Sequence, residues 1–287
     1  MKRLWRRLRA LWRVSASALA RYDAEDGAAM AGYVAYSTFL AVFPFAIFAT
    51  ALLGALVTDQ MREEWMAALF ELAPEHVALT LEPVIDNVTR DRGGALITVS
   101  AAGALWAASN AIESIRVAFD RAYGIGDARG FLARRALALA FVLLAVATFA
   151  LLAVLVIAAP LALALVETHL GVATPYGLGL VRYAVGLAVF AGFLALLHLA
   201  LPSRPPSSRR IAPGIVVTVA LWAAGAWAFS VYLSLAPSFS LTYGAFAGVI
   251  VTLLFFYLTG AAIILGAAVN ATLLAFRHAR LAETTAS

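Results

Sequence analysis

Long apolar stretches separated by short polar segments dominate the pattern of this chain. A helix needs about 20 mainly apolar residues to cross a hydrocarbon core of roughly 30 Å. Stretches of that order cover residues 32–57, 94–112, 135–166, 179–201, 211–235 and 244–276. Because these runs are continuous and lack alternation of apolar and polar positions, a β-barrel is not expected. The pattern predicts an all-α polytopic membrane bundle of six transmembrane helices within residues 32–276.

Two polar segments carry amphipathic patterns of their own. Residues 1–31 form an arm whose apolar residues fall near one helical face among basic residues; these are Leu4, Leu8, Leu11, Trp12 and Leu19. Such a helix is typical of the surface of an anionic cytoplasmic leaflet, and supplying charge for topology is an equally good interpretation. Residues 58–93 are acidic and repeat apolar residues at helical spacing, which predicts a short external helix. Residues 277–287 are predicted to be a cytoplasmic tail.

Composition supports the membrane class. Hydrophobic residues make up 63% of the chain, charged residues make up 13%, and the mean hydropathy is +0.91. Soluble domains contain roughly 25% charged residues. The chain has no cysteine, which excludes disulfides and thiolate metal sites.

The distribution of basic residues predicts the orientation. Of the 21 lysines and arginines, 17 lie before the first span, between spans two and three, between spans four and five, or after span six. By the positive-inside rule these four segments, and both termini, are cytoplasmic. Because the charge is spread over four segments rather than gathered on one face, the net charge of +5 does not indicate nucleic-acid binding.

Polar residues within the spans are the main candidates for a site. Unpartnered polar groups cost several kcal/mol in hydrocarbon, so they tend to face a bundle interior or a water-filled cavity. The candidates, from spans one, two, five and six and their ends, are Tyr33, Tyr36, Ser37, Thr38, Pro44, Ser109, Asn110, Glu113, Arg116, Asp120, Tyr232, Tyr243, Tyr257 and Asn270. We expect them to converge on a polar cavity or, alternatively, to form a packed and hydrogen-bonded core.

One cluster among these candidates shows helical periodicity. Ser109, Glu113, Arg116 and Asp120 recur every three or four residues and share one face of a helix leaving the membrane. Arg116 can pair with Glu113 at i−3 and with Asp120 at i+4. The cluster is either an ion-paired cap at the cytoplasmic end of span two or a gate or substrate contact.

Span one contains a proline at Pro44. Its ring removes a backbone donor and clashes with the carbonyl of Leu40, which predicts a kink or break between them. Ser37 and Thr38 can satisfy the freed carbonyls locally, and a discontinuous span can also line a substrate cavity. Tyr33 and Tyr36 lie almost one turn apart, so their phenols should point the same way.

Small residues predict close helix packing. Gly260 and Gly266, with neighbouring alanines, give span six a surface that lets another backbone approach. The link LPSRPPSSRR at 201–210 is interpreted as a polar cytoplasmic turn.

Four successive segments together resemble the signatures of the YihY/BrkB family. They are AYSTFLAVFPF at 35–45, LWAASNAIESIRVAFDRAYG at 105–124, APG at 212–214 leading to Trp222 and Tyr232, and YGAFAGVIVTLLFFYLTGAAIILGAAVNA at 243–271. The resemblance implies a bacterial inner-membrane protein with six spans. The family's last motif commonly reads Gly-Ala-Glu-x-Asn-Ala, and this chain has Ala268 at the acidic position. A mechanism that needs that carboxylate is therefore not expected here.

Members of that family have been labelled ribonuclease BN, but the residues do not favour this activity. Metal-dependent phosphodiester hydrolysis needs clustered His, Asp or Glu ligands. The histidines, His76, His169, His198 and His278, are isolated in the sequence. We also find no Gly-x-Ser-x-Gly elbow and no P-loop. No catalytic residue, metal or cofactor is predicted, and an enzyme acting on lipid is a less favoured alternative.

The sequence leads to two functional hypotheses. The first is transport or translocation of a lipid-like or anionic amphiphile through a polar intramembrane cavity. The second is a non-transporting envelope scaffold that binds partners or lipid through the basic arm and the acidic external segment. The predicted partners are the phospholipid bilayer and anionic lipid at the arm, and the sequence leaves a homo-oligomer open.

Overall fold

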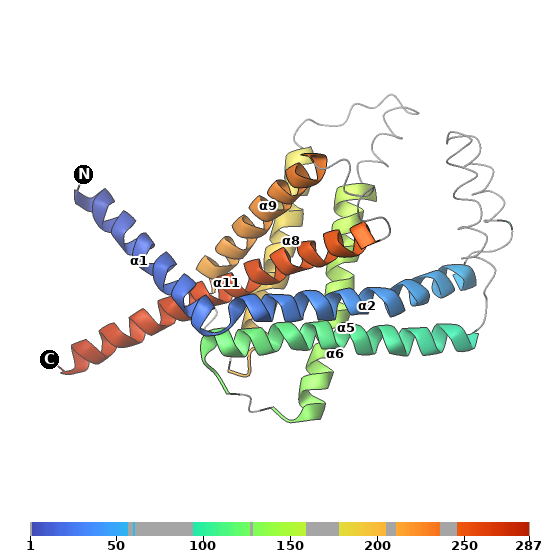
Figure 1. Ribbon diagram of the computed structural model, residues 1–287, viewed down its shortest axis with the longest axis horizontal. Helices are drawn as coiled ribbons and strands as arrows, with labels where there is room; N and C mark the ends of the chain where they lie inside the picture. The colour runs from blue at the N-terminus through green and yellow to red at the C-terminus, as the bar shows by residue number, and fades with distance from the viewer. Residues whose placement is uncertain are drawn as a thin grey trace. The chain divides into compact units, whose positions relative to one another are not determined.

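The computed structural model describes residues 2–56, 60, 94–126, 129–158, 178–204, 211–235 and 246–286 (Figure 1). Within these ranges the chain is helical apart from short turns, which confirms the all-α class. The helices are α1 (Lys2–Ala24), α2 (Gly27–Leu56), α5 (Gly94–Tyr123), α6 (Phe131–Ala153), the π-helical turn η1 (Val154–Ala158), α8 (Leu178–Ala200), α9 (Ala212–Leu235) and α11 (Phe246–Ala286).

Among the described residues, five helical segments are long and apolar enough to cross a membrane. They are Gly27–Phe48, Phe131–Val156, Gly179–Ala200, Ala212–Tyr232 and Gly248–Thr284. Each corresponds to one of the six predicted stretches. The remaining stretch, 94–112, forms the first part of α5 and is not among the five.

Several helices extend beyond the predicted limits. Helix α2 begins at Gly27 rather than at residue 32, and α6 begins at Phe131 rather than at residue 135. Helix α11 continues to Ala286, so the segment predicted as a tail prolongs the last helix. Most of the predicted external segment 58–93, the end of the third stretch and Tyr243 lie outside the described residues.

Helix α2 continues through Pro44, so of the predicted kink or break the break is wrong, and the kink stays a prediction. A proline removes one hydrogen bond, and the rest of the helical ladder on both sides can hold a membrane helix together. A β-carbon built on Gly103 of α5 would lie 3.7 Å from the β-carbon of Pro44, so α5 presents a residue without a side chain at this point.

The chain divides into two compact units, one formed by Met1–Tyr36 with Ala111–Ser287 and the other by Ser37–Asn110. In the first unit, α11 contacts both α9 and α1, and α6 contacts α8 (Figure 1). A small core of Ala31, Ala118 and Ile264 joins helices α2, α5 and α11. The contacts described below for Arg116, Arg129 and Asn270 all fall within this unit, so its helices provide the frame of the site.

Candidate functional site

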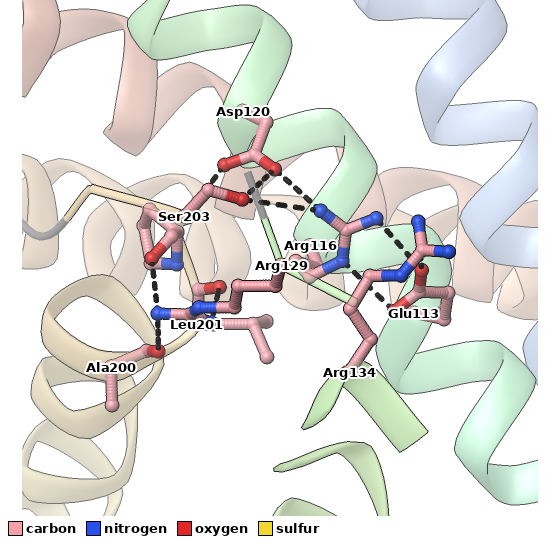
Figure 2. Close-up of polar contacts among 9 residues, drawn as sticks. Glu113, Arg116, Asp120, Arg129, Arg134, Ala200, Leu201 and Ser203 are labelled. Atoms are coloured by element: carbon pink, nitrogen blue, oxygen red, sulfur yellow. Dashed lines mark hydrogen bonds and ion pairs between the residues drawn. The ribbon is translucent and has the colours of Figure 1, made fainter. Parts of the chain in front are cut away.

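Arg116 is the centre of a charged cluster at the end of α5 (Figure 2). Its side chain is only 3% exposed. The guanidinium donates to both carboxylate oxygens of Glu113, at 2.9 and 2.7 Å, and to Oδ2 of Asp120 at 2.5 Å. The ion pairs predicted at i−3 and i+4 are therefore confirmed.

Asp120 connects this cluster to the link between α8 and α9. The backbone N–H of Ser203 donates to Oδ1 of Asp120 at 2.7 Å, and the Ser203 hydroxyl donates to Oδ2 at 2.8 Å. Arg116 Nη1 also reaches the Ser203 hydroxyl at 3.4 Å. The link that begins at residue 201 was interpreted as a polar turn. Through Ser203 it is also hydrogen-bonded to α5.

Arg129 brings the start of α6 to the end of α8. Its guanidinium donates to the carbonyls of Ala200, Leu201 and Pro202 at 3.2, 3.0 and 2.9 Å (Figure 2). Carbonyls at a helix C-terminus lack intrahelical donors and carry partial negative charge, so a guanidinium is a favourable cap. In the first turn of α6, Nη1 of Arg134 lies 3.9 Å from Oε1 of Glu113. The ends of α5 and α8 and the start of α6 therefore meet at one charged cluster.

The geometry of this cluster favours its interpretation as an ion-paired cap. Both carboxylates bind the Arg116 guanidinium, and Asp120 accepts three hydrogen bonds in total. A buried charge with good partners is strongly destabilised when one partner is removed. The cluster can therefore fix three helix ends relative to one another. A gate at this position stays a prediction.

Asn270 forms a second polar contact, between α11 and the start of α9. Its side chain is completely buried. Its Oδ1 accepts from the backbone N–H of Gly214 at 2.8 Å, and its Nδ2 donates to the carbonyl of Ile211 at 3.0 Å. Gly214 is the third residue of α9, where the backbone N–H lacks an intrahelical acceptor. Asn270 thus caps α9 from a neighbouring helix, and both the oxygen and the nitrogen of its side-chain amide are hydrogen-bonded.

Glycines let α9 and α11 approach closely at this contact. A β-carbon on Gly266 would collide with the Thr218 hydroxyl and lie 2.6 Å from the Gly214 carbonyl oxygen. A β-carbon on Gly214 would collide with the Gly266 carbonyl and the Asn270 amide. The Thr218 hydroxyl donates to the carbonyl of Ala262 at 3.3 Å. The close packing predicted for the small-residue surface of span six is confirmed here.

Gly260 makes a corresponding approach to α2. A β-carbon there would lie 3.2 Å from the Ala31 carbonyl oxygen and 3.3 Å from Val34. The small-residue surface of α11 therefore serves two neighbouring helices.

The other predicted site residues have different surroundings. Tyr33 and Tyr36 of α2 are 42% and 57% exposed, and Tyr232 of α9 is 48% exposed. Tyr257 is half-buried beside the core of the first unit. The predicted residues in the second unit are Ser37 and Ser109, which are buried, Thr38 and Pro44, which are half-buried, and Asn110, which is exposed. Ser109 donates to the carbonyl of Trp106 at 2.7 Å, so its hydroxyl is satisfied within its own helix.

Two further buried groups were not singled out in the sequence as site residues. His198 is fully buried at the end of α8, and its ring lies 4.7 Å from that of Phe119. Its Nδ1 lies 2.9 Å from the Leu194 carbonyl, which can only accept, so this nitrogen carries the proton. Burial raises the pKa of Tyr123 to about 12, and the nearby Asn270 amide only partly offsets this effect. His198 belongs to no local motif, whereas Tyr123 follows Asp120 by three residues and so continues the helical spacing of the charged residues in segment 105–124.

A cavity of about 150 Å³ lies between α9 and α11. Its walls are mostly apolar and include Leu221, Trp222, Phe255 and Leu265. Within the described part of the chain, no group of three or more His, Cys, Asp or Glu side chains could hold a metal ion.

These features define a helical membrane protein whose helices are joined by charged contacts at their ends and by glycine contacts along their length. The chain matches the family described as Virulence factor BrkB over residues 18–286, and it belongs to that family. This finding confirms the resemblance noted in the sequence.

Several curated proteins are similar to the chain. A protein of Bacillus subtilis (strain 168), named as the ribonuclease-like protein YfkH, is 28% identical over 256 residues, which cover 88% of this chain and 92% of the relative. A UPF0761 membrane protein of Mannheimia succiniciproducens is 33% identical over 99 residues, 34% of each chain. A UPF0761 membrane protein of Pseudomonas aeruginosa is 38% identical over 90 residues, 31% of this chain and 21% of the relative. No solved structure matches the chain.

Proposed function

We propose that this protein translocates a lipid-like or anionic amphiphile across the bacterial inner membrane. The observation that carries the proposal is the exposure of Tyr33 and Tyr36 on α2, at 42% and 57%, within a helical segment of membrane-spanning length. Phenol hydroxyls at hydrocarbon depth are costly without a partner. A polar headgroup moving along this face of α2 would supply one.

A scaffold is the second candidate, and a separate observation favours it. Asn270 and Arg116 were both candidates for a cavity, yet each is buried and hydrogen-bonded to a neighbouring segment. These contacts serve packing. A protein that only organises lipid or partners would need this packing and would not need a substrate pathway.

The proposal includes six spans and both termini in the cytoplasm. The first part of α5 is then the second span along the chain. The support is the segregation of 17 of the 21 basic residues to one predicted side. On this topology α1 lies along the anionic leaflet, and its exposed Trp5, Trp12 and Leu19 would enter the headgroup region. This part of the proposal concerns topology and lipid contact and is independent of transport.

We do not propose a ribonuclease, although one relative is named ribonuclease-like. Glu113 and Asp120 are the carboxylates of the charged cluster, and Arg116 binds both of them. A carboxylate held by a guanidinium is a poor ligand for a catalytic metal. We therefore propose a role without an enzymatic reaction.

The experiment is a translocation assay in proteoliposomes with fluorescent phospholipids and a panel of anionic amphiphiles. Wild type is compared with Tyr36→Phe and Asn110→Ala. Trp227→Phe is the matched control, because it also removes one exposed polar group from an aromatic side chain, 72% exposed, on a different membrane-spanning helix. We expect protein-dependent movement that Tyr36→Phe reduces several-fold and Trp227→Phe leaves unchanged.

Two results would count against this function. Folded wild-type protein that moves none of these compounds would favour the scaffold. Equal losses of translocation in Tyr36→Phe and Trp227→Phe would show that the α2 face has no special role.

A further inference from the structure

Arg182 is a cationic residue inside a membrane-spanning helix. It is the fifth residue of α8 and lies within the candidate span Gly179–Ala200. Its Nε atom is buried and has no hydrogen-bond partner in the described part of the protein. Its guanidinium carbon lies 4.8 Å from the centre of the Tyr183 ring, within the range of a cation–π contact. A guanidinium stays charged and offers five donors, of which a cation–π contact engages none, so the buried Nε–H is available to a further acceptor.

The position of Arg182 follows from the packing of α6 and α8. Arg129 holds the start of α6 against the end of α8, so the two helices run antiparallel. A β-carbon on Gly186 would lie 3.7 Å from Leu152, near the end of α6. Arg182 is one turn before Gly186 on the same face, and η1 packs against α8 at this end. Arg182 therefore lies beside the π-helical turn, at the opposite end of the hairpin from the charged cluster.

The separation of the two ends matches a bilayer. From Arg182 to Ala200 is 18 residues, which at 1.5 Å per residue is about 27 Å. The hydrocarbon core is about 30 Å thick. Arg182 would thus lie at one boundary of the hydrocarbon when the charged cluster lies at the other.

We propose that Arg182 and the Tyr183 ring, beside the π-helical turn Val154–Ala158, form a binding site for the phosphodiester of a membrane phospholipid. The planar guanidinium can donate two parallel hydrogen bonds to phosphate oxygens in a bidentate geometry. In addition, π-helical turns frequently occur at functional sites. Tyr183 is 58% exposed, so the site opens to the surroundings. Leu180, Val181 and Leu187 of α8 are also exposed and offer an apolar surface for the acyl chains. The site does not depend on translocation, because a scaffold could hold the same lipid.

The test is native mass spectrometry of the full-length protein released from detergent, titrated with phosphatidylglycerol. Arg182→Gln should bind this lipid about tenfold more weakly, since hydrogen bonds to charged groups are the strong ones. Arg204→Gln is the matched control: it removes one exposed positive charge at the other end of α8 and should change binding less than twofold. Arg182→Lys keeps the charge without the planar fork, so an intermediate affinity is expected, and this variant serves if Arg182→Gln does not fold.

Two further arms identify the ligand. Diacylglycerol, which has the acyl chains without the phosphate, should bind equally weakly to wild type and Arg182→Gln. Inorganic phosphate should not displace phosphatidylglycerol at millimolar concentration; if it does, the site takes free phosphate and the lipid is the wrong ligand. Equal binding of phosphatidylglycerol to wild type and Arg182→Gln would overturn the site, whatever the translocation assay shows.

Discussion

The charged cluster around Arg116 and the glycine contact between α9 and α11 solve the same problem with different chemistry. At the charged cluster, helix ends are held by ion pairs and by a guanidinium on free carbonyls. At the glycine contact, two backbones meet almost directly, and one amide, Asn270, caps a helix start. Full charges cost less outside a hydrocarbon core, whereas within it close packing and neutral hydrogen bonds are cheaper.

The largest effect is expected from breaking the charged cluster. Arg116→Gln leaves the buried Asp120 without its counter-ion and leaves Glu113 with the more distant Arg134, and removing one partner of a buried pair typically costs about 3–5 kcal/mol. The measurement is equilibrium unfolding in mixed micelles followed by circular dichroism. Arg121→Gln is the control, since its ion pair with Asp26 is exposed and should contribute less than about 1 kcal/mol. Equal losses of unfolding free energy in the two variants would show that the buried ion pairs of Arg116 contribute no more to stability than an exposed pair.

The next effect tests the glycine contact. Gly266→Leu would push a side chain into Thr218 and the Gly214 carbonyl, and overpacking of this kind costs about 3 kcal/mol. Gly192→Leu on α8 is the control, because no other side chain or backbone of the described residues lies within 4 Å of the position of its β-carbon. The same unfolding experiment should separate the two variants. If Gly266→Leu is as stable as Gly192→Leu, the two helices do not cross as closely as described.

The two regions also differ in how far the sequence could predict them. The Glu113–Arg116–Asp120 pairs are local, so helical spacing was enough to find them. Ser203 lies 83 residues from Asp120, and nothing in its own surroundings marks it as a partner. The small-residue surface of α11 was evident from its glycines and alanines. Asn270 was recognised as polar and intramembrane, but its choice between a cavity and a helix cap depended on where the start of α9 lies.

A smaller effect should follow from removing the cap on α9. Asn270→Ala leaves the Gly214 N–H buried without its acceptor, and the Ile211 carbonyl keeps only its bond from the Ile215 N–H, at a cost of about 2 kcal/mol. Thr259→Ala is the control, because its hydroxyl donates to a carbonyl of its own helix, that of Phe255. Amide hydrogen exchange should show faster exchange in the first turn of α9 for Asn270→Ala alone. Unchanged exchange there would mean that Asn270 does not act as a cap.

The smallest effect lies in the pH dependence of stability beside this contact. Burial raises the pKa of Tyr123 from 10 to about 12, so the folded protein favours the neutral phenol. This contribution is fully present below pH 10 and is lost as the pH rises through 12. Wild type should lose about 1–2 kcal/mol more than Tyr123→Phe between pH 10 and pH 12. Unfolding at both pH values measures the difference, and Tyr183→Phe, which removes an exposed phenol, should follow the wild type. If all three proteins lose stability equally, Tyr123 is not held in a desolvated position between the charged cluster and the glycine contact.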